Sequence, residues 1–169
     1  IMKIFGIVGW KNSGKTSLVA ALVREFGRRG LRVSTVKHAH HAFDLDRPGK
    51  DSYLHRDAGA QEVLIASHGR WALLHELRGA AEPPLAGLLG HMSPADLVLV
   101  EGFKDEAHPK LEVRRNAVEG SLLADSDPHI VAIATDTAIA PQGKPVFVLN
   151  DVAAIADFIQ GHCGLTNAP

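Results

Sequence analysis

The sequence predicts an α/β fold in which helices cover both faces of a mostly parallel sheet. Two observations support this prediction. Near the N-terminus, an apolar segment, a helical repeat and a second apolar segment follow one another within residues 3–36. Further along, short apolar runs recur at 96–101, 130–134 and 146–149, which is typical of buried parallel strands.

The first three elements form a strand–helix–strand unit. Lys3–Val8 is a short apolar strand that ends at Gly9. Between residues 16 and 29 the apolar side chains recur at steps of three and four, which is helical spacing (Leu18, Val19, Leu22, Val23 and Phe26). Gly27 and Gly30 end this helix, and residues 31–36 form the second strand. So short a unit implies a right-handed crossover between two parallel strands.

The middle of the chain is less regular. Residues 38–52 are polar and predict a long loop, followed by a short helix over 52–58. Strands at 62–67 and 71–77, joined by His68-Gly69-Arg70, predict a tight antiparallel hairpin. We expect this hairpin to make the sheet mixed.

The remaining elements complete one domain over residues 2–160. A helix is predicted at 83–91 and another at 151–159. Residues 110–114 alternate between polar and apolar side chains, which favours a strand at the edge of the sheet. Residues 161–169 lack a pattern, and we expect a flexible tail there.

Composition narrows the class of protein. The 169 residues are 46% hydrophobic and 22% charged, as in soluble globular proteins. A net charge of −1 gives no reason to expect nucleic acid or an acidic membrane surface as a partner, and no run approaches the ~20 apolar residues of a membrane span. The single cysteine, Cys163, excludes an internal disulfide and suits a reducing compartment. We therefore expect a cytoplasmic protein.

The strongest motif is GWKNSGKT at residues 9–16, between the first strand and the first helix. It fits G-x-x-x-x-G-K-[ST], in which Gly9 and Gly14 allow the backbone to turn its N–H groups toward phosphate oxygens. The helix N-terminus adds its dipole. Lys15 is expected to contact the β- and γ-phosphates, and Thr16 to bind Mg²⁺. A glycine turn with a solvated lysine is the alternative, but it does not explain the helix that follows. The motif predicts a phosphate-binding P-loop.

A P-loop also requires a carboxylate near its metal ion. Glu101 ends the run LVLV and precedes Gly102, which places its carboxylate at the carboxyl edge of the sheet, where open α/β sheets bind ligands. Glutamate is longer than the usual aspartate, so a water can lie between it and the metal. Asp46, in the loop after the second strand, is the other candidate. For both residues the alternative is a solvated acid.

The loop KHAHHAFDLDRPGKDS allows three interpretations. It contains one lysine, three histidines and two aspartates before its proline (Lys37, His38, His40, His41, Asp44 and Asp46). We expect Lys37 and the histidines to face phosphates or an anionic partner, as switch segments do. A transition-metal site is less favoured, because no cysteine is near and the spacing does not demand tetrahedral geometry. Plain surface polarity is the third interpretation.

The identity of the base depends on one carboxylate. Guanine presents N1–H and a 2-amino group, two donors that one carboxylate accepts together and that adenine lacks as a pair. Asp136, after IVAIAT, is in a position to recognise guanine, and Asn150, after VFVL, is an alternative. Both positions are also common turn or helix-cap sites.

Several stretches together resemble the molybdopterin-guanine dinucleotide biosynthesis protein B family: GWKNSGKT, VKHAHHAFDLDRPGKDS, RWALL and DLVLVEGFK. The resemblance spans residues 2–104, and the stretch IVAIATD extends it toward the C-terminus. It implies a P-loop NTPase-like, dimer-forming fold, GTP and Mg²⁺ binding with weak hydrolysis, and an accessory role in molybdenum cofactor biosynthesis. The implied partners are the guanylyltransferase that joins GMP to molybdopterin, other molybdenum-cofactor enzymes and a second copy of the chain.

The resemblance also implies the site residues. The phosphates would be lined by eight residues (Gly9, Lys11, Asn12, Ser13, Gly14, Lys15, Thr16 and Ser17). A mobile loop would include six more (Lys37, His38, His40, Asp46, Lys50 and Asp51). Glu101, Gly102 and Lys104 would form the metal-side motif. Relatives with a signature lysine carry it directly after the first glycine, whereas Trp10 comes before Lys11 here, which argues against a lysine that reaches across a dimer.

Two other functions use the same P-loop. A small-molecule kinase would need a second pocket, for which the loop at 38–52 is the candidate. A metallochaperone GTPase is suggested by the histidines of that loop and disfavoured by the absence of a CxxC motif. In each case the catalytic candidates are Lys15, Asp46 and Glu101.

Overall fold

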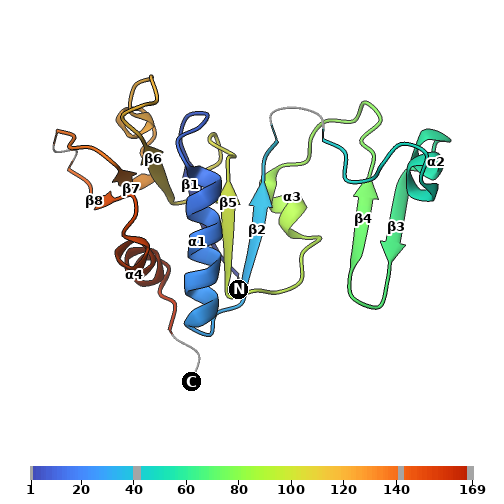
Figure 1. Cartoon of the computed structure of the whole chain (residues 1–169), viewed down its shortest axis with the longest axis horizontal. Coiled ribbons are helices and arrows are strands. Elements are labelled where there is room, and N and C mark those ends of the chain that lie inside the picture. The colour runs from blue at the N-terminus through green and yellow to red at the C-terminus, as the bar shows by residue number, and fades with distance from the viewer. Residues whose placement is uncertain (1, 40–42, 141–142, 167–169) are drawn as a thin grey trace. The chain divides into compact units, whose positions relative to one another are not determined.

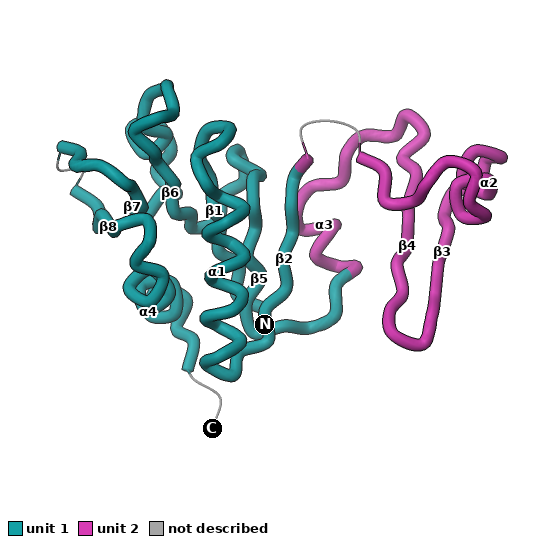
Figure 2. The backbone as a smooth tube through the Cα atoms, viewed as in Figure 1, with its two compact units in different colours: residues 1–38, 92–169 teal, residues 39–91 magenta. Residues whose placement is uncertain are grey.

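The computed structural model describes residues 2–39, 43–140 and 143–166. The chain forms two compact units (Figure 2). The first unit comprises Ile1–His38 and Met92–Pro169, and the second comprises Ala39–His91. None of the helices in the described residues is both long enough and apolar enough to cross a bilayer.

The first unit contains a six-stranded sheet in the order β2-β5-β1-β6-β7-β8, and every neighbouring pair is parallel (Figure 1). Its elements are β1 (Lys3–Val8), α1 (Lys15–Arg28), β2 (Val33–Lys37), β5 (Leu97–Glu101), β6 (Lys110–Arg114), the 3₁₀-helix η1 (Leu123–Asp125), β7 (Ile130–Thr135), β8 (Val146–Val148) and α4 (Val152–Cys163). This is the α/β class that the sequence predicts.

The second unit contains α2 (Asp51–Asp57), β3 (Glu62–Ala66), β4 (Trp71–His75) and α3 (Leu85–Leu89). Strands β3 and β4 form the predicted antiparallel hairpin. The hairpin is a separate two-stranded sheet, so the expectation that it makes the main sheet mixed was wrong. Hairpin pairing is set by the local turn, whereas attachment to another sheet depends on contacts that are distant in sequence.

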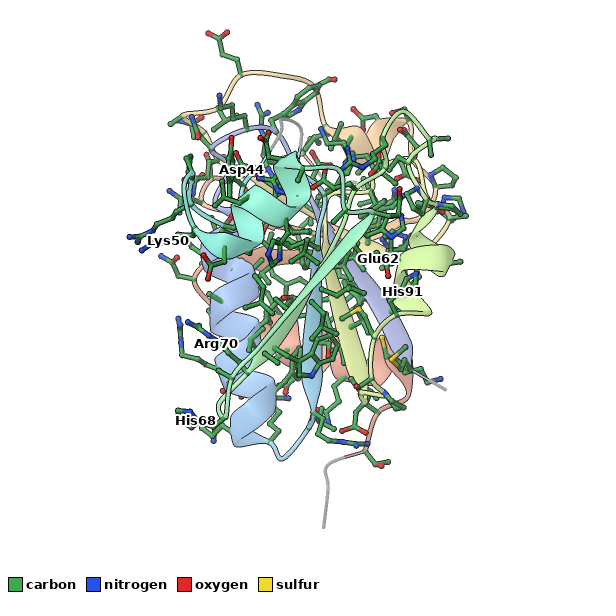
Figure 3. The ribbon with its side chains drawn as sticks, turned by 90° about the vertical axis from the view of Figure 1, so that its right-hand side faces the viewer. Asp44, Lys50, Glu62, His68, Arg70 and His91 are labelled. Atoms are coloured by element: carbon green, nitrogen blue, oxygen red, sulfur yellow. The ribbon has the colours of Figure 1, made fainter. Side chains whose placement is uncertain are left out.

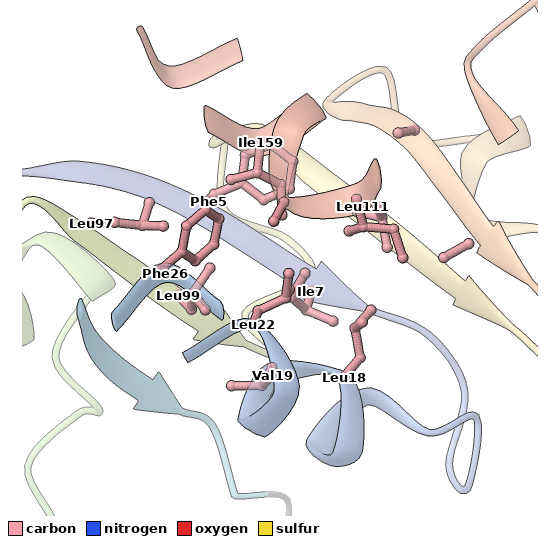
Figure 4. Close-up of a cluster of buried hydrophobic side chains, with 14 of the residues drawn as sticks. Phe5, Ile7, Leu18, Val19, Leu22, Phe26, Leu97, Leu99, Leu111 and Ile159 are labelled. Carbon is pink, nitrogen blue, oxygen red and sulfur yellow. The ribbon is translucent and has the colours of Figure 1, made fainter. Parts of the chain in front are cut away.

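Helices α1 and α4 share one face of the main sheet, where they bury a single apolar core (Figure 4). Phe5 and Ile7 of β1 are fully buried with Leu22 of α1 and Ile159 of α4. This follows from the alternation of β1 and from the three- and four-residue repeat of α1. Helix α4 continues four residues beyond its predicted end, because Cys163 is also buried in this core.

Strand β6 lies between β1 and β7, so its prediction as an edge strand was wrong. Its polar residues alternate as they do in an edge strand, but they are buried on the face opposite the core and have their own partners. The Glu112 carboxylate accepts hydrogen bonds from the N–H groups of Leu123 (3.0 Å) and Ala124 (2.8 Å), where η1 begins. The Lys110 ammonium lies 2.7 Å from Asp127 Oδ2. The 3₁₀-helix η1 of the first unit therefore packs on the face of the sheet opposite α1 and α4.

Candidate functional site

The P-loop, residues 9–16, connects β1 to α1 by a turn that only glycine can make at two positions. Gly9 has φ +149° and Gly14 has φ +98°. A Cβ atom added at Gly9 would lie 2.5 Å from the carbonyl oxygen of Val113, so no side chain fits there. The Ser13 hydroxyl is buried and has no hydrogen-bond partner among the described residues. A concave turn with an unpartnered hydroxyl is suited to an oxygen-rich ligand.

Lys15 is folded into this turn. Its Nζ donates hydrogen bonds to the carbonyl oxygens of Gly9 (3.0 Å) and Trp10 (2.7 Å). Burial lowers the pKa of Lys15, and the opposing charge of Glu101 offsets part of that effect. The ammonium is thus held at the mouth of the loop by neutral carbonyls, which an anionic phosphate can replace.

The structure brings Thr16 and Glu101 together at the carboxyl edge of the sheet. Thr16 Oγ1 donates a hydrogen bond of 2.8 Å to Glu101 Oε1. Lys37, at the end of β2, donates to the same carboxylate oxygen at 3.1 Å and lies 3.4 Å from Thr16 Oγ1. The order β2-β5-β1 explains this meeting, since parallel neighbours end at one edge.

The Thr16–Glu101 pair fits Mg²⁺ chemically. Hydroxyl and carboxylate oxygens are hard ligands, and two of them lie within hydrogen-bond distance of each other. The Lys37 ammonium already supplies positive charge at the same two oxygens. Its expected contact with phosphate stays a prediction.

Gly102 and His38 pack together next to this pair. Gly102 has φ +94°, and a Cβ atom added there would lie 2.9 Å from the Cβ of His38. The backbone N–H of His38 donates to the Glu101 carbonyl (2.9 Å), and its ring lies 4.7 Å from that of Phe103. Glycine at position 102 therefore allows His38, at the start of the loop after β2, to lie against Glu101 and Gly102.

The contacts of Trp10 explain why the P-loop can hold a tryptophan. Its Nε1 donates to the carbonyl of Ser121 (2.8 Å), and the Lys104 ammonium lies 4.8 Å from the ring centroid. A side chain at Gly120 would collide with the indole. Lys104 thus contacts the P-loop through the indole ring. The sequence alone does not reveal the hydrogen bond between Trp10 and Ser121, because these residues are 111 positions apart.

Asp136 follows β7 at the same edge of the sheet and is exposed. Its Oδ1 accepts a hydrogen bond of 2.8 Å from the backbone N–H of Asn116, which comes soon after β6. Asn150, the alternative, precedes the N-cap residue Asp151, whose carboxylate accepts from the N–H of Ala154 at 3.1 Å.

Asp46 belongs to the second unit, where it pairs with Arg56 of α2. The Asp46 Oδ1–Arg56 Nη2 distance is 2.8 Å, and the Asp46 side chain is 3% exposed. Asp44 shares the guanidinium at 2.9 Å and lies beside α2 (Figure 3). The catalytic and metal roles of Asp46 stay predictions.

Of the histidines in this loop, His40 and His41 lie outside the described residues. Among the residues that the structure does describe, no three histidine, cysteine, aspartate or glutamate side chains are placed to hold a metal ion. Lys11, Asn12 and Ser17 are exposed around the P-loop, and their contacts with phosphate stay predictions.

One residue that the motifs did not indicate is Arg115, directly after β6. A Cβ atom added at Gly14 would lie 3.0 Å from Arg115 Nε and 3.1 Å from its Nη2. The only signal in the sequence is an arginine directly after a strand that itself ends in arginine, and it has no meaning until β6 is placed beside β1.

Comparisons with known proteins show the family of this chain. The family model described as "Molybdopterin guanine dinucleotide synthesis protein B" matches residues 4–136. The chain is 38% identical over 166 residues to the molybdopterin-guanine dinucleotide biosynthesis adapter protein of Escherichia coli, covering 94% of this chain and 92% of that protein. It is 35% identical to the protein of the same name from Haemophilus influenzae, covering 93% and 87%.

Solved structures show the same fold. A MobB homolog from Bacillus stearothermophilus matches with a TM-score of 0.71 at 27% identity, covering 96% of this chain and 99% of that chain. Bacillus subtilis MobB matches with a TM-score of 0.75 at 25% identity, covering 96% and 98%. Since the family model spans most of the sequence and the relatives align along nearly their whole lengths, the chain belongs to the molybdopterin guanine dinucleotide synthesis protein B family.

Proposed function

We propose that this chain is an adapter protein of molybdopterin guanine dinucleotide biosynthesis that binds GTP and Mg²⁺ at its P-loop and hydrolyses GTP slowly. Family membership and the names of the two relatives support the adapter role. The observation that carries nucleotide binding is the 2.8 Å contact between Thr16 Oγ1 and Glu101 Oε1, beside a P-loop whose lysine is in place.

The residues of the P-loop have separate tasks in this proposal. Backbone N–H groups at the start of α1 bind phosphate oxygens, and Lys15 exchanges its two carbonyl partners for the β- and γ-phosphates. Thr16 and Glu101 would hold Mg²⁺, directly or through water. Bound Mg²⁺ neutralises charge on the β- and γ-phosphates. Hydrolysis is expected to be slow, because VEGFK places no water-orienting glutamine near Glu101.

The adapter role is tested by binding to the molybdopterin guanylyltransferase. With the chain immobilised, we expect retention of that enzyme to rise when GTP and Mg²⁺ are added. Lys15→Ala should keep only the nucleotide-free level of retention. If wild type retains the enzyme equally with and without GTP, partner binding does not depend on the nucleotide. No retention at all would contradict the adapter role.

Guanine recognition by Asp136 is tested by exchanging the base. Asp136→Asn keeps one acceptor but cannot accept both donors of guanine, so we expect GTP affinity to fall about 10- to 100-fold. The amide instead matches the N1–H donor and the C2 carbonyl acceptor of xanthine, so XTP affinity should rise. Titration calorimetry with GTP, XTP and ATP measures both changes. If wild type binds ATP more tightly than GTP, or if the variant still binds GTP more tightly than XTP, Asp136 does not recognise guanine.

A homodimer through the hairpin is also part of the proposal. The register pairs Leu64 with Leu73 and Ala66 with Trp71, so these side chains share one face of the two-stranded sheet. Leu64 is 62% exposed, Trp71 64% and Leu73 40%. A lone hairpin is marginally stable, and a two-fold axis lets one apolar face cover another copy of itself.

We expect the double replacement of Leu64 and Trp71 by serine to convert a dimer into a monomer in sedimentation equilibrium. Val146→Ser is the matched control, since Val146 is 44% exposed and belongs to the first unit. The control should stay dimeric. Wild type that sediments as a monomer at micromolar concentration would exclude this interface.

A further inference from the structure

Arg115 lies against the glycine that precedes the P-loop lysine. Strand β6 pairs in parallel with β1, with Val8 opposite Glu112, so residues after both strands emerge at one edge of the sheet. The Cζ of Arg115 lies 3.3 Å from the position that a Cβ of Gly14 would occupy, and Nε and Nη2 are closer still. The guanidinium therefore covers the backbone of the loop where α1 begins.

One nitrogen of this guanidinium, Nε, is buried and lacks a hydrogen-bond partner among the described residues. A buried cationic N–H without an acceptor is unfavourable, and most such groups in proteins are paired. The planar fork of arginine suits phosphate oxygens, which it can bind with two parallel hydrogen bonds.

The backbone from Arg115 to Val118 is held by two hydrogen bonds. Its carbonyl accepts from the N–H of Val118 at 3.1 Å. The next residue, Asn116, donates its N–H to Asp136, which recognises guanine in the proposed function. One short segment thus connects the P-loop with the loop that recognises the base.

The strand order then gives a direction along the edge of the sheet. Glu101 follows from β5, the P-loop from β1, Arg115 from β6 and Asp136 from β7, and these strands are consecutive neighbours. The metal side, with the γ-phosphate, lies toward β5, whereas the base lies toward β7. Arg115 is between the P-loop and the base, on the flank away from Glu101.

We propose that Arg115 is a phosphate-binding residue of the nucleotide site, and that it contacts the α- and β-phosphates, which GDP and GTP share. This inference rests on the proposed function, since it assumes a guanine nucleotide in the P-loop. Arg115 would then raise the affinity for both nucleotides with or without Mg²⁺, and it would not distinguish between bases.

The test is calorimetry of Arg115→Met, which keeps an unbranched side chain and removes the guanidinium with its charge and hydrogen-bond donors. We expect GDP and GTP affinities to fall by similar factors of about 10- to 100-fold, with or without Mg²⁺. The ratio of GTP to XTP affinity should stay at the wild-type value. Arg28→Gln, which removes an exposed arginine near the C-terminal end of α1, is the control and should bind like wild type.

Two other results for Arg115→Met would contradict the inference. Wild-type affinity in Arg115→Met would leave Arg115 a packing residue, and a loss confined to GTP would move the contact to the γ-phosphate. Arg115→Gln gives the same readout if the methionine variant does not fold. Wild type that binds neither GDP nor GTP would instead defeat the proposed function itself, and this inference with it.

Discussion

Lys15→Ala is expected to lower GTP affinity by about 100-fold or more, because charge-assisted hydrogen bonds to phosphate are lost. Among the residues that the structure describes, the Lys15 ammonium donates its hydrogen bonds to two loop carbonyls, and burial lowers its pKa. Removing it should therefore change the free energy of unfolding by no more than about 1 kcal/mol. Titration calorimetry and urea unfolding measure the two quantities.

The control for this variant is Lys3→Ala, which removes one exposed lysine from the start of β1. It should bind GTP like wild type. If Lys15→Ala also binds like wild type, the assigned role of the lysine is wrong. If it unfolds, the two carbonyl contacts stabilise the loop far more than neutral acceptors are expected to.

Glu101→Gln is expected to reduce GTP hydrolysis by about 10-fold or more at fixed Mg²⁺ while changing nucleotide affinity much less. The amide keeps an oxygen that can accept from Thr16, but it removes the negative charge at the metal side of the loop. Excess Mg²⁺ should restore part of the rate, and without Mg²⁺ the two proteins should bind GTP about equally. Phosphate release measured across a Mg²⁺ series gives these values.

Glu119→Gln, at an exposed loop position, controls for the loss of one carboxylate. It should keep the wild-type Mg²⁺ dependence. A Glu101→Gln protein with that same dependence would mean that Glu101 only orients Thr16 and Lys37.

The local parts of this site can be predicted from the sequence. Strand, glycine turn and helix are each encoded by neighbouring residues, so residues 3–28 fold as expected. The meeting of Thr16 and Glu101 crosses 85 positions, yet it was foreseeable because the carboxyl ends of parallel strands share one edge.

The parts that could not be predicted depend on which strand lies beside which. Lys110 and Glu112 look like solvent-facing residues of an edge strand, because their partners Asp127 and η1 come later in the chain. A strand at the edge of the sheet need not lie beside β1, so the sequence could not predict the contact between Arg115 and Gly14. The separate sheet of the hairpin could not be predicted for the same reason. Its turn is set by neighbouring residues, whereas pairing with the main sheet would depend on residues distant in sequence.

A crystal structure with a non-hydrolysable GTP analogue and Mg²⁺ tests the central claim most directly. We expect phosphate oxygens within hydrogen-bond distance of the backbone N–H groups of the P-loop, with Lys15 Nζ moved from its two carbonyls onto the phosphates. We also expect Mg²⁺ beside Thr16 and Glu101. A nucleotide bound elsewhere, with Lys15 still on the carbonyls of Gly9 and Trp10, would contradict this claim.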